Sequence, residues 1–261
     1  MNDKLLLTEQ HEDIVVLTMN RPDKRNALND GLVGELEAFF AKPPVGCRCI
    51  VLQGAGDHFS AGLDLFEMLE TRTPDPILSM RRSKQWHRVF DLIQFGEVPV
   101  VCVLKGAVIG GGMELAAATH VRVSESSVSF QLPEGQRGIF VGGGGSVRIP
   151  RILGAGRVVE MMLTGRSIAA EESKLLGLSH YLVEEGAGFE RAMDLARQVT
   201  ANAPSSNYAV INAIPRISEM ATAEGLFAET MVTSMTRHAG QSGSRIKEFF
   251  EGRKREKQQD A

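Results

Sequence analysis

The feature that most constrains the fold is the segment VVCVLKGAVIGGGMELAAA, residues 100–118. It begins within a continuous apolar run, residues 98–106, which predicts a strand covered on both faces. Three consecutive glycines then allow a tight turn, and the small apolar residues over 114–119 predict a helix. The N-terminus of such a helix presents free N–H groups and a positive dipole end. The segment therefore predicts either tight strand-to-helix packing or a turn that binds a ligand oxygen.

The rest of the chain alternates predicted strands with predicted helices. Strands are predicted at 14–20, 49–54, 121–126, 128–132 and 181–185, and helices at 29–41, 77–95, 156–165 and 169–177. From about residue 188 only helices are predicted, over 189–204, 207–217 and 244–257. We therefore expect the α/β class, with a core over residues 1–190 and a helical region over 191–261.

Composition excludes several classes of protein. A formal net charge of -3 gives no overall attraction to nucleic acid or to an anionic membrane. The three cysteines, Cys47, Cys49 and Cys102, fit neither a disulfide framework nor a zinc site, and we expect reduced, buried thiols. We find no signal peptide and no apolar run of the length of a membrane span. The expectation is a cytoplasmic protein.

The glycine motifs do not match nucleotide-binding or hydrolase patterns. GGGMEL has Leu115, and GAGRVV has Val159, where a dinucleotide fingerprint needs its third glycine. GGGGSVR lacks the lysine of a P-loop, and HFSAG has His58 where a nucleophile elbow needs glycine. A second strand, turn and helix is instead predicted over residues 54–68, GAGDHFSAGLDLFEM. Two such turns could aim two N–H groups at one oxygen, as an oxyanion hole does.

Four blocks carry a family resemblance: NRPDKRNALN, GAGDHFSAGLDL, PVVCVLKGAVIGGGMELA and LPEGQRGIFVGGGGS. In this order and at this spacing, the chain resembles the enoyl-CoA hydratase/isomerase (crotonase) family. LTGRSIAAEESKLLGL and the terminal FFEGRKRE extend the resemblance over nearly the whole chain. The resemblance implies a spiral of ββα units and a C-terminal helical region that closes the CoA site and forms homotrimers or homohexamers. It also implies an acyl-CoA thioester substrate and no cofactor or metal.

The resemblance also implies a set of site residues. The backbone N–H groups of Leu63 and Gly111 would form the oxyanion hole. Glu114 and Glu134, twenty residues apart, match the two glutamates of the hydratases. Glu114 would orient and deprotonate water, and Glu134 would protonate Cα, with the two titrating as a coupled pair. CoA would contact Lys24, Arg25, Ala27, Ala61, Asp64 and Leu65, and the acyl group would contact Phe66, Met68, Trp86, Phe90 and Phe140.

Other activities within the family are also weighed. Gly142 occupies the position where dienoyl-CoA isomerases and aryl-CoA dehalogenases have an aspartate. A Δ3,Δ2-enoyl-CoA isomerase needs only the acid at Glu134, so Glu114 favours hydration of a short or medium-chain enoyl-CoA. A methylthioacryloyl-CoA hydratase or a hydratase-lyase remains an alternative. RNA binding, known in one relative, is disfavoured because the tail EGRKREK mixes charges of both signs.

Several positions depart from the usual family pattern. Phe66 replaces a lysine that often contacts phosphate, VGGGG replaces PGAGG, Thr119 and His120 replace Cys-Asp, and Lys257 replaces a terminal aromatic residue. Together they predict a divergent branch with an altered acyl pocket. No partner pattern surrounds His58, His87 or His120, so we expect structural or surface roles for them.

Overall fold

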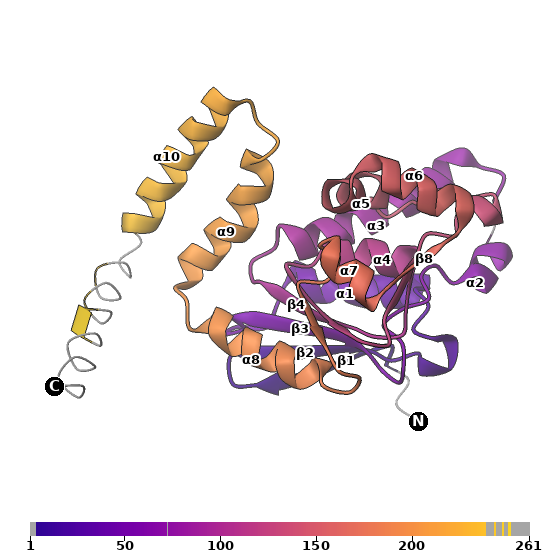
Figure 1. The fold of residues 1–261 in the computed structure, drawn as a ribbon, viewed down its shortest axis with the longest axis horizontal. Helices are drawn as coiled ribbons and strands as arrows, with labels where there is room; N and C mark the ends of the chain where they lie inside the picture. The colour runs from indigo at the N-terminus through magenta and orange to yellow at the C-terminus, as the bar shows by residue number, and fades with distance from the viewer. Residues whose placement is uncertain (1–3, 72, 239–242, 244–246, 248–249, 252–261) are drawn as a thin grey trace.

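The computed structural model describes residues 4–71, 73–238, 243, 247, 250 and 251, and its centre is a six-stranded sheet (Figure 1). The sheet order is β1 (Leu6–His11), β2 (Ile14–Met19), β3 (Cys49–Gly54), β4 (Val100–Leu104), β6 (Val121–Glu125) and β9 (Tyr181–Val183). Only β1 and β2 pair antiparallel in this sheet. A second sheet has the order β5 (Ala107–Ile109), β7 (Ser129–Gln131) and β8 (Ser167–Ala169).

Helices cover the sheets on both sides. They are α1 (Asp30–Ala41), α2 (Leu65–Glu70), α3 (Pro76–Gln94), α4 (Gly111–Ala117), α5 (Gly145–Leu153), α6 (Ala155–Thr164), α7 (Ala170–Leu175), α8 (Gly188–Thr200), α9 (Pro204–Ile217) and α10 (Thr222–His238). Two short 3-10 helices are η1 (Pro22–Lys24) and η2 (Gly135–Arg137). The helices predicted at 29–41, 77–95, 156–165 and 169–177 are thus confirmed.

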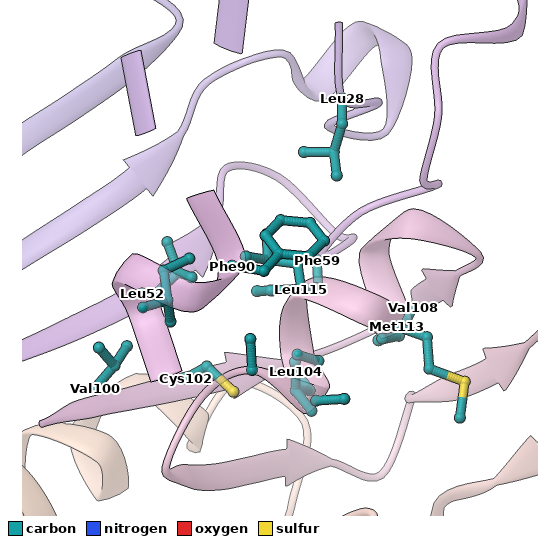
Figure 2. Close-up of a cluster of buried hydrophobic side chains, with 14 of the residues drawn as sticks. Leu28, Leu52, Phe59, Phe90, Val100, Cys102, Leu104, Val108, Met113 and Leu115 are labelled. Atoms are coloured by element: carbon teal, nitrogen blue, oxygen red, sulfur yellow. The ribbon is translucent and has the colours of Figure 1, made fainter. Parts of the chain in front are cut away.

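The large sheet is buried on both faces, as the continuous apolar run at residues 98–106 predicts. Along β2, Val15 and Leu17 face the larger core, whereas Ile14 and Val16 face a second cluster with Ala192 and other residues of α8. This division follows from the two-residue repeat of a strand. Figure 2 shows β4 side chains of the larger core beside Phe90 of α3 and Leu115 of α4.

The three cysteines are buried in the hydrophobic clusters, Cys47 and Cys102 in the larger core and Cys49 in the cluster that faces α8. All three are free and buried, and burial raises the pKa of Cys47 and Cys102 to about 11 and that of Cys49 to about 12. The expectation of reduced, buried thiols is therefore confirmed.

A repeated ββα arrangement places the helix starts. β4 and β5 precede α4, with β4 in the large sheet and β5 in the small one, and β6 and β7 repeat the pattern in parallel. The preceding unit, β3 and α2, joins the small sheet through a parallel bridge between Ser60 and Val108. The expected spiral of ββα units is confirmed.

The C-terminal part of the chain is helical, as predicted from residue 188 onward. Helix α8 packs on strands of the large sheet, whereas α9 and α10 lie to one side of the α/β body (Figure 1). The helix predicted over 244–257, with Lys257, lies largely outside the described residues. The division of the chain at residue 190 stays a prediction.

Candidate active site

The parallel register brings two helix starts together. Ser60 pairs with Val108, and Leu63 and Gly111 each follow by three residues, so their amides are neighbours. A Cβ added to Gly62 would lie 2.9 Å from the nitrogen of Gly111. Within the part of the chain that the structure describes, neither amide donates a hydrogen bond. Two free N–H groups in one place form the arrangement expected of an oxyanion hole.

Trp86 explains why residue 111 is a glycine. A Cβ at this position would meet the Trp86 ring at 2.7 Å, and the ring of Trp86 is buried with 6% of the residue exposed. The indole therefore packs directly on the backbone of the α4 N-terminus. Any larger residue at 111 would displace either the helix start or the ring.

Glu114 lies one turn into α4 and is only 3% exposed. Its Oε1 accepts hydrogen bonds from the N–H groups of Gly143 (2.8 Å) and Gly145 (2.7 Å). Burial raises the pKa of Glu114, and the two backbone N–H groups oppose that rise by stabilising the ionised form. The carboxylate is thus fixed in orientation by the glycine loop.

The glycine loop that holds Glu114 is itself held by Arg148 of α5, which is 8% exposed. The guanidinium donates from Nη1 to the Gly143 carbonyl (3.1 Å), from Nε to Gln94 (2.6 Å) and from Nη2 to Asp91 (2.5 Å). Gln94 and Asp91 belong to α3. A continuous hydrogen-bonded path therefore runs from α3 through Arg148 and the loop to Glu114.

Glu134 follows β7 and faces the same space. It is 6% exposed, and among the described residues its Oε2 has no hydrogen-bond partner. Burial raises the pKa of Glu134 to about 7, and the charge of Glu114 adds to the rise. A Cβ on Gly110 would meet Glu134 Oε1 at 2.5 Å, so the glycine makes room for the carboxyl group. At neutral pH this carboxyl can hold a proton for delivery.

Both glutamates open into a cavity of about 920 Å³, whose wall also includes Leu63 and Gly111. Of the predicted acyl-pocket residues, the structure places Met68, Trp86 and Phe140 at this wall. Phe66 and Phe90 are not among the lining residues. Phe66 is 72% exposed on α2, and Phe90 is fully buried behind Trp86, with ring centroids 5.7 Å apart. Phe66 therefore faces solvent and Phe90 packs in the core, so neither prediction of an acyl-pocket residue is right.

Comparison of the chain with known protein families and proteins shows its family. The model of the enoyl-CoA hydratase/isomerase family matches residues 9–259. The chain belongs to this family. It is 32% identical over 234 residues to the 2,3-dehydroadipyl-CoA hydratase of Escherichia coli K12, covering 88% of this chain and 89% of the relative. It is 31% identical over 202 residues to the short-chain-enoyl-CoA hydratase of Clostridium acetobutylicum, covering 76% of each.

Solved structures agree with the family. A crystallised protein of Rhodopseudomonas palustris CGA009, named provisionally as an enoyl-CoA hydratase, matches with a TM-score of 0.92 and 45% identity. The match covers 97% of this chain and 96% of that one. An enoyl-CoA hydratase of Bacillus anthracis matches with a TM-score of 0.89 and 26% identity, covering 95% and 97%. The resemblance stated from the sequence and the prediction of an enzyme of this family are confirmed.

The predicted CoA-contacting residues come from two segments that are hydrogen-bonded to each other, the 24–27 loop and the turn before α2. The amide of Ala61 donates to the carbonyl of Arg25 (2.8 Å), which joins the 24–27 loop to the turn before α2. None of the six predicted residues, Lys24, Arg25, Ala27, Ala61, Asp64 and Leu65, is among those that line the cavity. Their contact with CoA stays a prediction, since the structure shows only where they lie.

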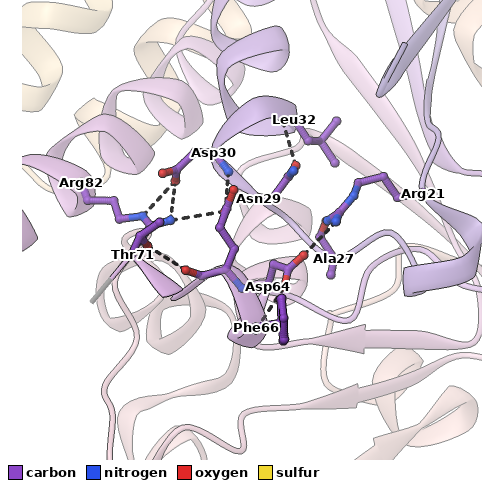
Figure 3. Close-up of polar contacts among 10 residues, drawn as sticks. Arg21, Ala27, Asn29, Asp30, Leu32, Asp64, Phe66, Thr71 and Arg82 are labelled. Carbon is purple, nitrogen blue, oxygen red and sulfur yellow. Dashed lines mark hydrogen bonds and ion pairs between the residues drawn. The ribbon is translucent and has the colours of Figure 1, made fainter. Parts of the chain in front are cut away.

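Asp64 also stabilises the start of α2. It pairs with Arg21 at 2.8 Å and accepts the amides of Phe66 and Glu67 at the start of α2 (Figure 3). Burial acts to raise the pKa of Asp64, but Arg21 and these amides outweigh it and lower the pKa. Asp64 therefore fixes the start of the helix that follows Leu63.

Sequence reasoning missed Gly143, Gly145 and Arg148 as parts of the site. The run VGGGG was noted only as a departure from the family pattern. Nothing in the sequence shows that two of its amides face a carboxylate about thirty residues earlier. Two further observations concern the described residues: no helix could cross a membrane, and no three His, Cys, Asp or Glu side chains are grouped to hold a metal ion.

Proposed function

We propose that this protein adds water syn across the 2,3 double bond of a short or medium-chain 2-enoyl-CoA thioester. The observation that carries the proposal is a single cavity that holds two buried glutamates beside two free backbone N–H groups. Conjugate addition of water needs a base, an acid and stabilisation of an enolate, and these groups can supply all three.

The roles follow from the surroundings of each group. The N–H groups of Leu63 and Gly111 bind the thioester oxygen as it gains negative charge. Glu114, fixed by two amides, orients water and takes its proton as the oxygen bonds to Cβ. Glu134, whose pKa is raised to about 7 by burial, gives its proton to Cα and restores the neutral thioester. The reaction transfers no electrons to or from the substrate, so the proposal includes no redox cofactor.

Fixation of Glu114 favours hydration over double-bond isomerisation. An isomerase of this family needs only the acid at the position of Glu134, and a second immobilised carboxylate would have no task there. The three free, buried thiols support a reducing, cytoplasmic setting.

The test is product identification with three substrates: crotonyl-CoA, a 3-enoyl-CoA and a heteroatom-substituted acryloyl-CoA. Mass spectrometry of the crotonyl-CoA reaction should show a 3-hydroxyacyl-CoA, one water heavier than the substrate. Conversion of the 3-enoyl ester to a 2-enoyl ester without hydration would make the protein an isomerase. Cleavage of the hydrated product would make it a hydratase-lyase.

A further inference from the structure

Three arginines line the cavity: Arg81, Arg82 and Arg137. Arg82 is neutralised by its neighbours, since it pairs with Asp30 (2.7 Å) and Glu67 (3.3 Å) (Figure 3). Among the described residues, neither Arg81 nor Arg137 has an ion-pair partner. The cavity wall therefore carries two guanidinium groups without an ion-pair partner among the described residues, and the charge of Arg137 also acts to lower the pKa of Glu134.

The residues that line the cavity differ in their exposure to solvent. Trp86 and Val141 are buried beside the glutamates, whereas Arg81 on α3 and Arg137 at the end of η2 are exposed. Arg137 follows Glu134 by one turn, and its amide donates to the Glu134 carbonyl (3.0 Å). Apolar side chains thus surround the two glutamates at the buried end of the cavity, and the exposed arginines lie where we place the far end of an acyl group.

An alkyl tail fits this wall poorly. It would cover two cations without offering them a hydrogen-bond acceptor, and desolvating a charge without a partner is costly. A carboxylate would offer each guanidinium charge-assisted hydrogen bonds, and arginine presents a planar fork suited to that group.

We propose that the preferred acyl group ends in an anionic group, a carboxylate a few carbons beyond the double bond, bound by Arg81 and Arg137. This inference rests on the proposed function, because it takes the cavity as the acyl site. The phosphates of CoA are the competing anions. None of the residues predicted to contact CoA lines the cavity, which favours the acyl terminus.

The experiment is calorimetric binding of two unreactive six-carbon esters, adipyl-CoA and hexanoyl-CoA, with free CoA as a third ligand. The two esters share the thioester and the chain length and differ in the terminal carboxylate. The variants are Arg81→Gln, Arg137→Gln and the double substitution. Lys84→Gln is the matched control, because Lys84 is an exposed cation of α3 that is not among the cavity-lining residues.

We expect wild-type protein to bind adipyl-CoA at least about tenfold more tightly than hexanoyl-CoA, since one good charged hydrogen bond gives that ratio. The ratio should fall in each arginine variant, vanish in the double variant and persist in Lys84→Gln. No preference in the wild type would overturn the inference. Equal weakening of both esters and of free CoA by the arginine variants would assign these residues to the phosphates instead.

Measuring the rate of hydration separates this inference from the proposed function. The six-carbon 2-enoyl-CoA ester with a terminal carboxylate should be hydrated faster than 2-hexenoyl-CoA at subsaturating concentration. If adipyl-CoA binds preferentially but no enoyl-CoA is hydrated, the acyl-terminus site stands and the proposed reaction fails.

Discussion

The side chain of Glu134 is buried where an ionised carboxylate is poorly solvated. Its ionisation therefore lowers the free energy of unfolding as pH rises. Burial raises its pKa from an ordinary value of 4.5 to about 7. Because the folded state binds the proton more tightly than the unfolded chain, the associated stability is complete below pH 4.5 and is lost as pH rises through 7. The proposed catalytic acid thus carries a stability cost at neutral pH.

Glu134→Gln should therefore be more stable than wild type at pH 8, by about 2 kcal/mol after allowance for solvent screening, because glutamine cannot ionise. At pH 5 the difference should fall to about a quarter of that value, because the carboxyl of the unfolded chain is still partly ionised above pH 4.5. Urea unfolding at the two pH values measures it. A difference that does not change with pH would show that Glu134 has an ordinary pKa.

Gly145 shows how closely the glycine loop fits Glu114. A Cβ at residue 145 would meet Glu114 Cγ at 2.6 Å, although alanine can adopt the helical backbone there. Gly145→Ala should displace the carboxylate and lower kcat for hydration by about 100-fold, the order expected for a misplacement near 1 Å. Gly156→Ala is the control, because its Cβ would meet open space. Equal activity in both variants would show that the close contact between residue 145 and Glu114 does not position the carboxylate.

At the residue scale, the sequence could predict the two glutamates but not every pocket residue. The family resemblance points to Glu114 and Glu134, and the structure places both at the cavity. Phe66 and Phe90 were chosen for size and position in the chain. Their directions depend on how α2 and α3 rotate against their neighbours, and one-dimensional spacing does not set that rotation.

At the scale of elements, Arg148 couples α3 and α5 to the glycine loop. Lysine keeps the charge but cannot reach three acceptors as the guanidinium fork does. Arg148→Lys should lower kcat about tenfold with little change in KM, since the loop would hold Glu114 less firmly. Arg151→Lys is the control, being an exposed residue of the same helix that pairs with Glu219. A loss of activity equal in the two variants would indicate a general effect on α5.

The elements that sequence reasoning missed are short, exposed or interrupted. β1 reads LLTEQH and is mostly exposed at the sheet edge, so it lacks the apolar pattern of a strand. β5 and β8 have three residues each. α5 contains Pro150, which argues against a helix when only the sequence is seen. These elements form because they pair or pack with neighbours that are distant in the sequence, and local sequence patterns do not show such contacts.

At the scale of the whole molecule, α10 carries an apolar stripe at four-residue spacing. Phe227, Met231 and Met235 are 69%, 52% and 71% exposed, on a helix that lies away from the α/β body (Figure 1). We propose that this stripe is buried between subunits of a homotrimer or homohexamer, as the family resemblance implies. Large exposed apolar surfaces commonly mark such contacts.

Light scattering after size-exclusion chromatography should therefore report three or six chains per particle. Met231→Asp should dissociate the assembly, because it places a charge in the apolar contact. Thr233→Asp, an exposed polar position of α10, should leave the assembly intact. A monomeric wild-type protein would refute the proposed contact.

Turnover of crotonyl-CoA by three variants tests whether Glu114 and Glu134 act together in adding water. The variants are Glu114→Gln, Glu134→Gln and the double substitution. Each single variant should lower kcat at least about 100-fold with an unchanged circular dichroism spectrum. The double variant should lose little more, because the pair acts as a unit. Wild-type turnover in either single variant would contradict the account.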